Sequence, residues 1–235
     1  MIGLKFVINR DGLKVLFFWN CIGRGMESKV YHKKSEAYKY YRFFSSCDRL
    51  NFQEVQYLSN ISTNRILLPK DILYTITGQF KGYTTSYIED LGLIHFMKLP
   101  KDIILHEFKL LKADCDVLGE KGVVIRDILP KDSRVSNHVF HHGLYFIDPG
   151  RFYLDFVSLP NEIVLENQKM IDDFLFFRVF SSYADYEFGK DGYSYTKLYQ
   201  LKRFCNDKNI SFMDFIASDI CEENLENYVK RKIYY

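Results

Sequence analysis

The sequence predicts an α+β protein, in which an antiparallel sheet with one helix is followed by a mainly helical second half. Short apolar runs separated by turn residues fill the first part, while apolar residues at helical spacing dominate the later part. Hydrophobic residues make up 47% of the 235 residues, enough for a sizeable core. Strands give way to helices near Glu89–Gly92, so we expect two parts, residues 1–90 and 91–235.

The strands of the first part are expected around turn signals. Residues 4–19 contain two apolar runs that flank Asp11-Gly12, a strong hairpin signal. "KVYHK" and "EAYKYY" follow as a further pair, and "RILLPKDILYTI" and "GQFKGYTTSYI" as a later pair. Between these pairs, residues 49–60 predict a helix, because apolar side chains recur at helical spacing at Leu50, Val55, Leu58 and Ile61.

The second part begins with a long predicted helix from Lys101 to Leu118. Its apolar stripe consists of Ile103, Ile104, Phe108, Leu111, Cys115 and Leu118. Strands are expected in "GVVIRDI" and in "HVFHHGLYFID". Further helices are expected at 161–182, 194–206, 211–218 and 222–231.

The composition argues against several classes of protein. A net charge of +2 with interspersed signs gives neither the basic footprint of a nucleic-acid-binding protein nor a polybasic membrane patch. The five cysteines form no Cys-x-x-Cys pair, so neither a zinc site nor a disulfide framework is expected. Because the first residues lack the pattern of a signal peptide and no run is long enough to span a bilayer, we expect a cytoplasmic protein with no membrane or nucleic-acid partner.

The segment "GRGMESKV" can hold phosphate. Gly23 and Gly25 let a backbone approach phosphate oxygens without Cβ clashes and donate N–H groups to them. The segment resembles the Gly-rich loop of protein kinases, G-x-G-x-x-G-x-V, with Ser28 in place of the third glycine and Val30 at the valine. The resemblance implies that these residues and Arg24 cover a bound nucleotide. An ordinary hairpin turn with two glycines is the alternative.

Two charged residues continue the resemblance. Lys39, at the end of "EAYK", stands where the kinase family has V-A-I-K, which implies a contact with the α- and β-phosphates. Lys33 and Lys34 compete for this role but lie in or beside the turn between strands. Glu54, on the helix expected at 49–60, would pair with Lys39 and hold it toward the nucleotide.

The stretch "IRDI" resembles the kinase motif H-R-D-L, with Ile125 in place of the histidine. Asp127 would then orient the acceptor hydroxyl and take its proton. An asparagine ligand for a metal should follow. Counting along the motif H-R-D-L-x-x-x-N reaches Asp132. Asn137 lies further on, after a longer loop, and is followed by apolar residues as in the family's strand, so it is the preferred ligand. Asp132 stays the alternative, since either side chain supplies oxygen to Mg²⁺.

The strand "GLYFID" ends in Asp148-Pro149-Gly150, which resembles D-F-G with Pro149 in place of Phe. The resemblance makes Asp148 a ligand of the Mg²⁺ that bridges the phosphates, while a simple β-turn is the other interpretation. The stretch "GYTTSYIED" resembles the family's hinge, which implies that backbone groups of Thr85 to Tyr87 meet the adenine.

The resemblance covers residues 15–155 or so and implies a two-lobed protein kinase-like fold, a sheet-rich first lobe and a helical second lobe. It implies ATP and Mg²⁺, with Mn²⁺ as a substitute, and γ-phosphoryl transfer to a hydroxyl, a protein Ser or Thr first of all. The sequence lacks a recognisable A-P-E motif. A small-molecule kinase of the aminoglycoside or choline type, a pseudokinase that binds nucleotide without turnover, and transfer of AMP instead of phosphate all remain open.

Overall fold

The computed structural model describes residues 6–10, 12–15, 20–24, 28–42, 49–92, 95–96, 99–127 and 137–175. Within these residues the chain is an α+β protein, as the sequence predicts, with one large antiparallel sheet, two small two-stranded sheets and three helices. None of the described helices is long and apolar enough to cross a membrane.

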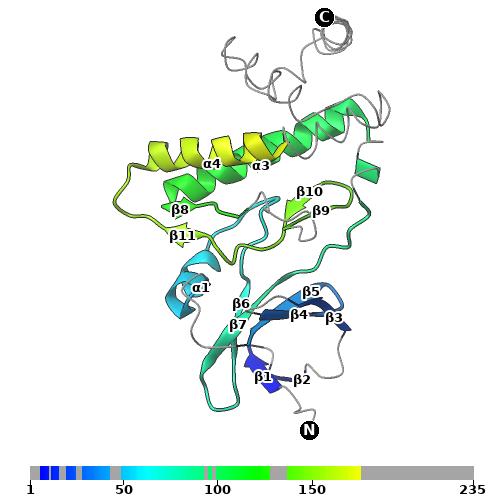
Figure 1. Ribbon diagram of the computed structural model, residues 1–235, viewed down its shortest axis with the longest axis vertical. Coiled ribbons are helices and arrows are strands. Elements are labelled where there is room, and N and C mark those ends of the chain that lie inside the picture. Colours follow the sequence, from blue (N-terminus) through cyan, green and yellow to red (C-terminus); the bar gives the residue numbers. More distant parts are fainter. Residues whose placement is uncertain are drawn as a thin grey trace, which may run out of the picture.

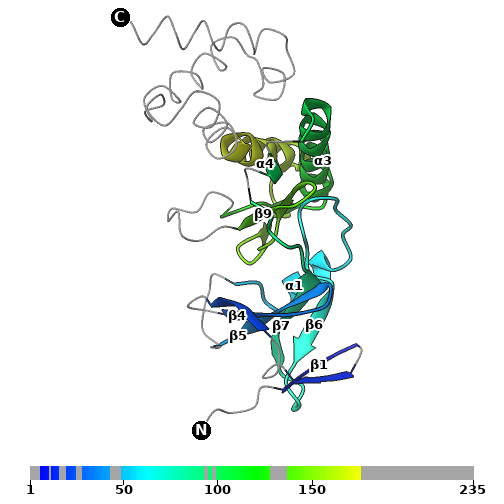
Figure 2. The same ribbon diagram turned by 90° about the vertical axis from the view of Figure 1, so that its right-hand side faces the viewer.

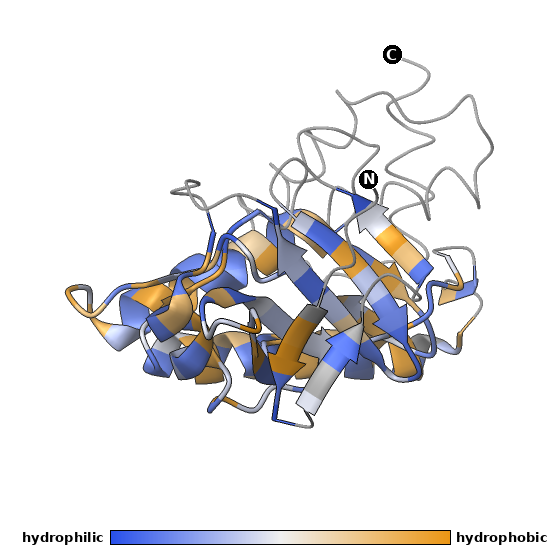
Figure 3. Cartoon of the chain, turned by 90° about the horizontal axis from the view of Figure 1, so that it is seen from below, coloured by the Kyte–Doolittle hydropathy of each residue, from blue (hydrophilic) through white to orange (hydrophobic). Residues whose placement is uncertain are grey.

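The large sheet has seven strands, and every neighbouring pair is antiparallel. In spatial order they are β2 (Gly12–Val15), β1 (Phe6–Asn9), β6 (Asp71–Tyr74), β7 (Phe80–Ser86), β5 (Glu36–Tyr41), β4 (Ser28–Lys33) and β3 (Asn20–Arg24). Seen from below and coloured by hydropathy, the strands carry hydrophilic and hydrophobic residues close together (Figure 3). This mixture is typical of an antiparallel sheet with one face on a core and the other in water.

The predicted hairpins are confirmed where the structure describes them. In the first hairpin Asn9 pairs with Gly12, and in the hairpin of β4 and β5 Lys33 pairs with Glu36. Lys34 lies in the second turn with a positive φ of 55°. The strand expected over "RILLPKDILYTI" is shorter than predicted, because only Asp71–Tyr74 joins the large sheet.

The predicted helices begin close to the expected residues. They are α1 (Phe52–Leu58), α3 (Lys101–Glu120) and α4 (Pro160–Phe174). Helix α1 is capped by Asn51, whose side chain accepts a hydrogen bond from the Glu54 N–H while the Glu54 carboxylate accepts one from the Asn51 N–H. This reciprocal capping satisfies two of the free N–H groups at the helix start. The later part of the helix expected at 161–182, and the helices expected beyond residue 190, lie outside the described residues.

Two short sheets lie between the large sheet and the helices α3 and α4 (Figures 1 and 2). One pairs β9 (His138–Phe140) with β10 (Leu144–Phe146), and the other pairs β8 (Val123–Val124) with β11 (Tyr153–Leu154). The segment "HVFHHGLYFID" is therefore a hairpin. Helices α3 and α4 pack against each other on the side of the two small sheets that is away from the large sheet (Figure 1).

The main core joins the helices to the sheet. From the predicted stripe of α3, the side chains of Phe108, Leu111, Cys115 and Leu118 are fully buried, whereas Ile103 is exposed. Val55 and Leu58 of α1 and Phe174 of α4 belong to the same cluster, as do Tyr83 of β7 and Phe146 of β10. One continuous core therefore fixes the strands that carry the candidate site against the helices.

A buried carboxylate ties the segment after α1 to helix α3. Asp114 accepts hydrogen bonds from the N–H groups of Asn64, Arg65 and Ile66 and from the Asn64 side chain, at 2.6–2.9 Å. The carboxylate is fully buried, and four donors compensate for its lost hydration. With this segment held on α3, Ile66 bridges Phe146 of β10, and Leu67 donates its N–H to the Phe146 carbonyl. This anchoring explains why residues 65–67 lie outside the large sheet.

Candidate functional site

Lys39 projects from β5, near the middle of the large sheet. It pairs with Val30 of β4 on one side and with Tyr83 of β7 on the other. Its ammonium lies 2.5 Å from Oδ1 of Asp148 and 5.8 Å from the centre of the Tyr83 ring. The Lys39 side chain is 13% exposed and that of Asp148 37%, so the ion pair is partly shielded from water. The sequence singled out both residues, and the structure brings them together.

Gly82 permits the close approach of β7 to β5, the strand that carries Lys39. It stands opposite Tyr40 with φ of 144°, and a Cβ at this position would lie 1.9 Å from the carbonyl oxygen of Lys39. No side chain fits there, so glycine is required for β7 to pair with β5 beside Lys39. The glycine inside "FKGYTTS" is the signal that could have located this contact from the sequence.

Asp148, Pro149 and Gly150 turn the chain next to the lysine. The Gly150 N–H donates to Asp148 Oδ1 at 2.9 Å, and the Phe152 N–H donates to the Pro149 carbonyl at 3.0 Å. A Cβ at Gly150 would lie 2.7 Å from the Lys39 ammonium and 2.8 Å from Asp148 Oδ1. The turn expected from Asp-Pro-Gly is thus present, and its glycine also leaves room for the ion pair.

Tyr83 places a buried hydroxyl behind the ion pair. The residue is 1% exposed, and its hydroxyl has no hydrogen-bond partner among the described residues. Burial raises the Tyr83 pKa well above its ordinary value, and the negative charge of Asp148 raises it further. The hydroxyl therefore stays protonated and can donate a hydrogen bond. Sequence reasoning missed this residue.

Asp127 and Asn137 form the second half of the site. Asp127 has a positive φ of 61°, which is unusual for a residue other than glycine and is held here by its surroundings. The Asn137 Nδ2 donates to the Asp127 carbonyl at 2.7 Å and lies 3.4 Å from its Oδ2. The preferred metal ligand is therefore in contact with the expected proton acceptor. Its alternative, Asp132, lies outside the described residues.

A buried asparagine on α4 positions the strand that leads to Asp127. The Asn167 side chain accepts a hydrogen bond from the Ile125 N–H at 2.8 Å and donates one to the Val123 carbonyl at 2.9 Å. Asn167 and Ile125 are both fully buried. Asn167 lies on a helix with no motif around it, and nothing in its local sequence signals this role.

Glu54 does not make the expected pair with Lys39. Its carboxylate accepts the capping hydrogen bond from the Asn51 N–H at 2.7 Å, while Lys39 pairs with Asp148. A glutamate at the third position of a helix can reach back to the backbone N–H of the capping residue. This local hydrogen bond takes the place of the pair with Lys39.

The residues expected to cover a nucleotide belong mostly to strands. Gly23 and Arg24 lie in β3, and Ser28 and Val30 in β4, while Gly25 lies outside the described residues. Strands β3 and β4 pair with a register shift between Cys21 and Gly23. A Cβ at Gly23 would meet Val30 at 3.5 Å, an ordinary contact, so packing alone does not require glycine there.

The expected hinge is partly occupied by internal hydrogen bonds. The Thr85 hydroxyl donates to the Leu68 carbonyl at 3.1 Å. The Tyr87 N–H donates to the Ser35 carbonyl at 2.8 Å, so it is not free for an adenine, contrary to the expectation for this group. The Tyr87 ring stacks on His32, with ring centres 3.6 Å apart.

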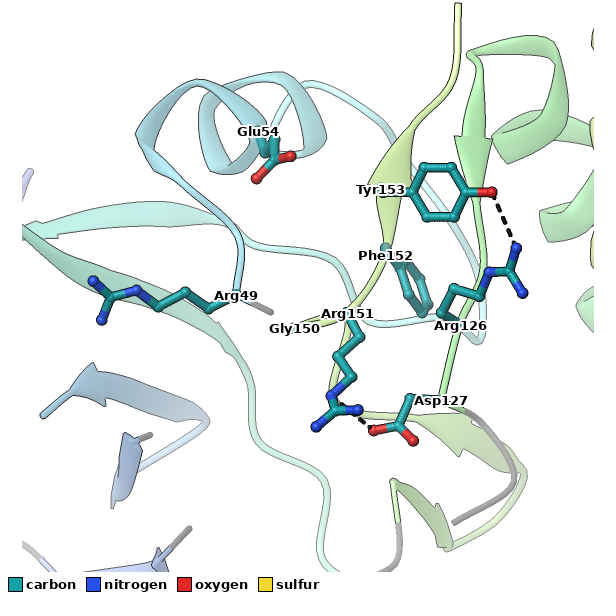
Figure 4. A pocket seen from close by; sticks show the side chains of 8 residues that line it. All are labelled: Arg49, Glu54, Arg126, Asp127, Gly150, Arg151, Phe152 and Tyr153. Atoms are coloured by element: carbon teal, nitrogen blue, oxygen red, sulfur yellow. Dashed lines mark hydrogen bonds and ion pairs between the residues drawn. The ribbon is translucent and has the colours of Figure 1, made fainter. Parts of the chain in front are cut away.

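A cavity of about 370 Å³ lies beside Asp127 (Figure 4). Its lining consists of Arg49, Glu54, Arg126, Asp127, Gly150, Arg151, Phe152 and Tyr153. The Arg151 Nε lies 3.5 Å from Asp127 Oδ2, whereas Arg126 turns to the other side and donates to the Tyr153 hydroxyl at 3.1 Å. Arg126 also pairs with Glu166 of α4 at 2.9 Å, and the Tyr153 hydrogen bond raises its pKa.

The structure thus brings Lys39 to Asp148 and Asn137 to Asp127, and it links the two pairs through Gly150 and Arg151. No protein-family model matches the chain, and no curated protein matches it.

Proposed function

We propose that the chain is an ATP-dependent phosphotransferase of the protein kinase-like type, which transfers the γ-phosphoryl group to a hydroxyl. The hydroxyl that we favour is that of a protein Ser or Thr. The observation that carries this proposal is the ion pair between Lys39 and Asp148. A strand lysine and a turn aspartate, expected at the phosphates and at the metal, meet although 109 residues separate them. The contact of Asn137 with Asp127 supports it independently.

The donor atoms of the site suit Mg²⁺. Asp148 offers a carboxylate, and Asn137 uses Nδ2 for both of its described side-chain contacts, which leaves its Oδ1 without a partner among the described residues. Magnesium is commonly held by one or two protein oxygens together with substrate phosphates. Asp148 and Asn137 would hold the ion, which supplies charge neutralisation for the phosphates.

The remaining steps belong to residues of the chain. Lys39, released from Asp148, binds phosphate oxygens and neutralises part of their charge. Asp127 orients the acceptor hydroxyl and accepts its proton while the oxygen bonds to the γ-phosphorus. The bond from that phosphorus to the bridging oxygen breaks, and its electron pair leaves with ADP. Catalysis of this kind consists of positioning and charge stabilisation.

A two-lobed arrangement is part of the proposal. Lys39 comes from the large sheet, whereas Asp127, Asn137 and Asp148 come from the segments of the two small sheets below α3 and α4. We infer that the nucleotide lies between these two parts, with the residues of β3 and β4 over its phosphates. The contribution of site residues from both parts supports this arrangement.

One observation favours a pseudokinase as the second candidate. Kinase activity requires the strand lysine to pair with the helix glutamate. Here Glu54 caps its own helix, and Lys39 is bonded to Asp148. A protein fixed in this arrangement would bind nucleotide but would not turn it over.

The test is label transfer from γ-labelled ATP, with Mg²⁺ and then Mn²⁺, to the protein itself and to generic protein acceptors. Asp148→Asn is the inactive variant, and Asp102→Asn, an exposed carboxylate at the start of α3, is the matched control. We expect label with the wild type and Asp102→Asn only. Nucleotide binding without label in any acceptor would favour the pseudokinase, and the absence of both would refute the proposal.

A further inference from the structure

Arginines are the most frequent charged residues in the described lining of the cavity beside Asp127. Arg49, Arg126 and Arg151 line it together with the carboxylates of Glu54 and Asp127, and no lysine is among these described residues. Guanidinium groups match the planar geometry of carboxylate and phosphate oxygens and donate two parallel hydrogen bonds to them. At about 370 Å³ the cavity has room for a side chain or a small molecular group.

The cavity lies on the acceptor side of the proposed transfer site. Asp127, the proposed proton acceptor, lines it, whereas Lys39 and Asp148 are not among its lining residues. Gly150 connects the two places, since it lines the cavity and donates its N–H to Asp148. We therefore expect a group that presents its hydroxyl to Asp127 to place its neighbouring atoms in this cavity.

The arginines differ in how firmly they are held. Arg126 is fixed by the Tyr153 hydroxyl and by Glu166. The only ion pair or hydrogen bond of the Arg151 side chain among the described residues is through Nε, 3.5 Å from Asp127 Oδ2, so neither terminal nitrogen has a polar partner there. Its side chain is 53% exposed, and an ion pair of this length and exposure is weak. Arg151 can therefore leave Asp127 and pair with another anion of comparable charge at little cost in free energy.

We propose that Arg151 selects an acceptor that carries an oxyanion, a carboxylate or a phosphate, next to its reacting hydroxyl. This inference rests on the proposed function. When the acceptor binds, Arg151 leaves Asp127 and binds this oxyanion. Asp127 is then free to take the proton of the hydroxyl. Arg151 is in this view a specificity-determining residue, and its pairing with Asp127 keeps the carboxylate engaged until a suitable acceptor arrives.

The test uses serine peptides that differ only in the residues beside the serine: glutamate, phosphoserine or alanine. We expect kcat/KM to be about tenfold or more higher for at least one of the anionic peptides than for the alanine peptide. Comparison of the glutamate and phosphoserine peptides identifies the preferred oxyanion. Arg151→Gln should reduce the preference to about twofold or less. Arg10→Gln changes an arginine at the far hairpin, beside Asp71, and should retain it.

Equal rates for the three peptides in the wild type would overturn this inference, as would an Arg151→Gln variant with an intact preference. If no peptide takes label, fluorescence anisotropy of the same peptides decides. Tighter binding of an anionic peptide that is lost in Arg151→Gln supports the anion site, and equal or absent binding overturns it. Calorimetry of ATP binding with Mg²⁺ tests the proposed function separately. A failure of the anion site is therefore distinguishable from a failure of the proposed function.

Discussion

Lys39 and Asp148 form an ion pair of 2.5 Å that joins the centre of the large sheet to the turn after β10. In the proposed function these two groups act apart, one on phosphate oxygens and one on a metal. In the absence of nucleotide each neutralises the other, which limits the cost of placing both in a partly shielded position. The ion pair is therefore both a link within the fold and the resting form of the proposed site.

The first prediction concerns the coupling between these two residues. Lys39→Met, Asp148→Asn and the double variant form a cycle in which the free energy of unfolding is measured in urea. We expect a coupling energy of about 1–2 kcal/mol, less than for a fully buried pair because Asp148 is partly exposed. Strictly additive effects would show that the contact contributes nothing to the fold.

The second prediction concerns Gly82. Gly82→Ala places a Cβ 1.9 Å from the Lys39 carbonyl, so β7 must move away from β5. We expect the free energy of unfolding to fall by about 3 kcal/mol or more. Gly78→Ala is the matched control, since Gly78 also has a positive φ, 81°, but nothing lies within 4 Å of its Cβ position. Its loss should be only about 1 kcal/mol. Equal losses in the two variants would contradict the close approach.

The third prediction concerns Asn167. Asn167→Leu keeps the volume but leaves the buried Ile125 N–H and Val123 carbonyl unpaired. We expect a loss of about 2–4 kcal/mol of unfolding free energy. Gln168→Leu, at the next position of α4 with one side-chain hydrogen bond to Asp116, should lose about 1 kcal/mol or less. A smaller loss in Asn167→Leu than in the control would mean that Asn167 does not hold the strand before Asp127.

The fourth prediction concerns alkaline pH. The Tyr83 pKa is raised in the folded protein, above about 10 in the unfolded chain. The unfolded state thus loses the proton first, and stability falls as pH rises from about 10 toward the folded pKa. Tyr83→Phe removes this contribution. Urea midpoints measured at pH 8 and near pH 11 should therefore differ less in Tyr83→Phe than in the wild type, and an equal difference would count against the shift.

Local patterns predicted much of the fold. Turn residues located the hairpins, and apolar stripes located the three described helices. Each of these signals is contained within a short stretch of sequence, so it can be recognised without the rest of the fold. The position of residues 65–67 outside the large sheet depends on Asp114, about fifty residues away in the sequence, and no local signal indicates it.

The sequence motifs named four residues that the structure brings into contact, although the sequence did not predict which of them pair. Lys39, Asp127, Asn137 and Asp148 fall into two contacting pairs. Glu54 does not join them, because its carboxylate accepts the capping hydrogen bond of its own helix. Tyr83 and Asn167, and the role proposed for Arg151, had no local signal, since they depend on contacts between distant segments. Gly82 was missed although a glycine inside a strand is a local signal of close backbone approach.

The most direct test of the account is calorimetry of ATP binding with and without Mg²⁺, in the wild type, Asp148→Asn and Lys39→Met. We predict binding that strengthens with Mg²⁺ in the wild type, loses this dependence in Asp148→Asn, and weakens about tenfold or more in Lys39→Met. An affinity that ignores both Mg²⁺ and the two substitutions would contradict the assignment of Lys39 to the phosphates and of Asp148 to the metal.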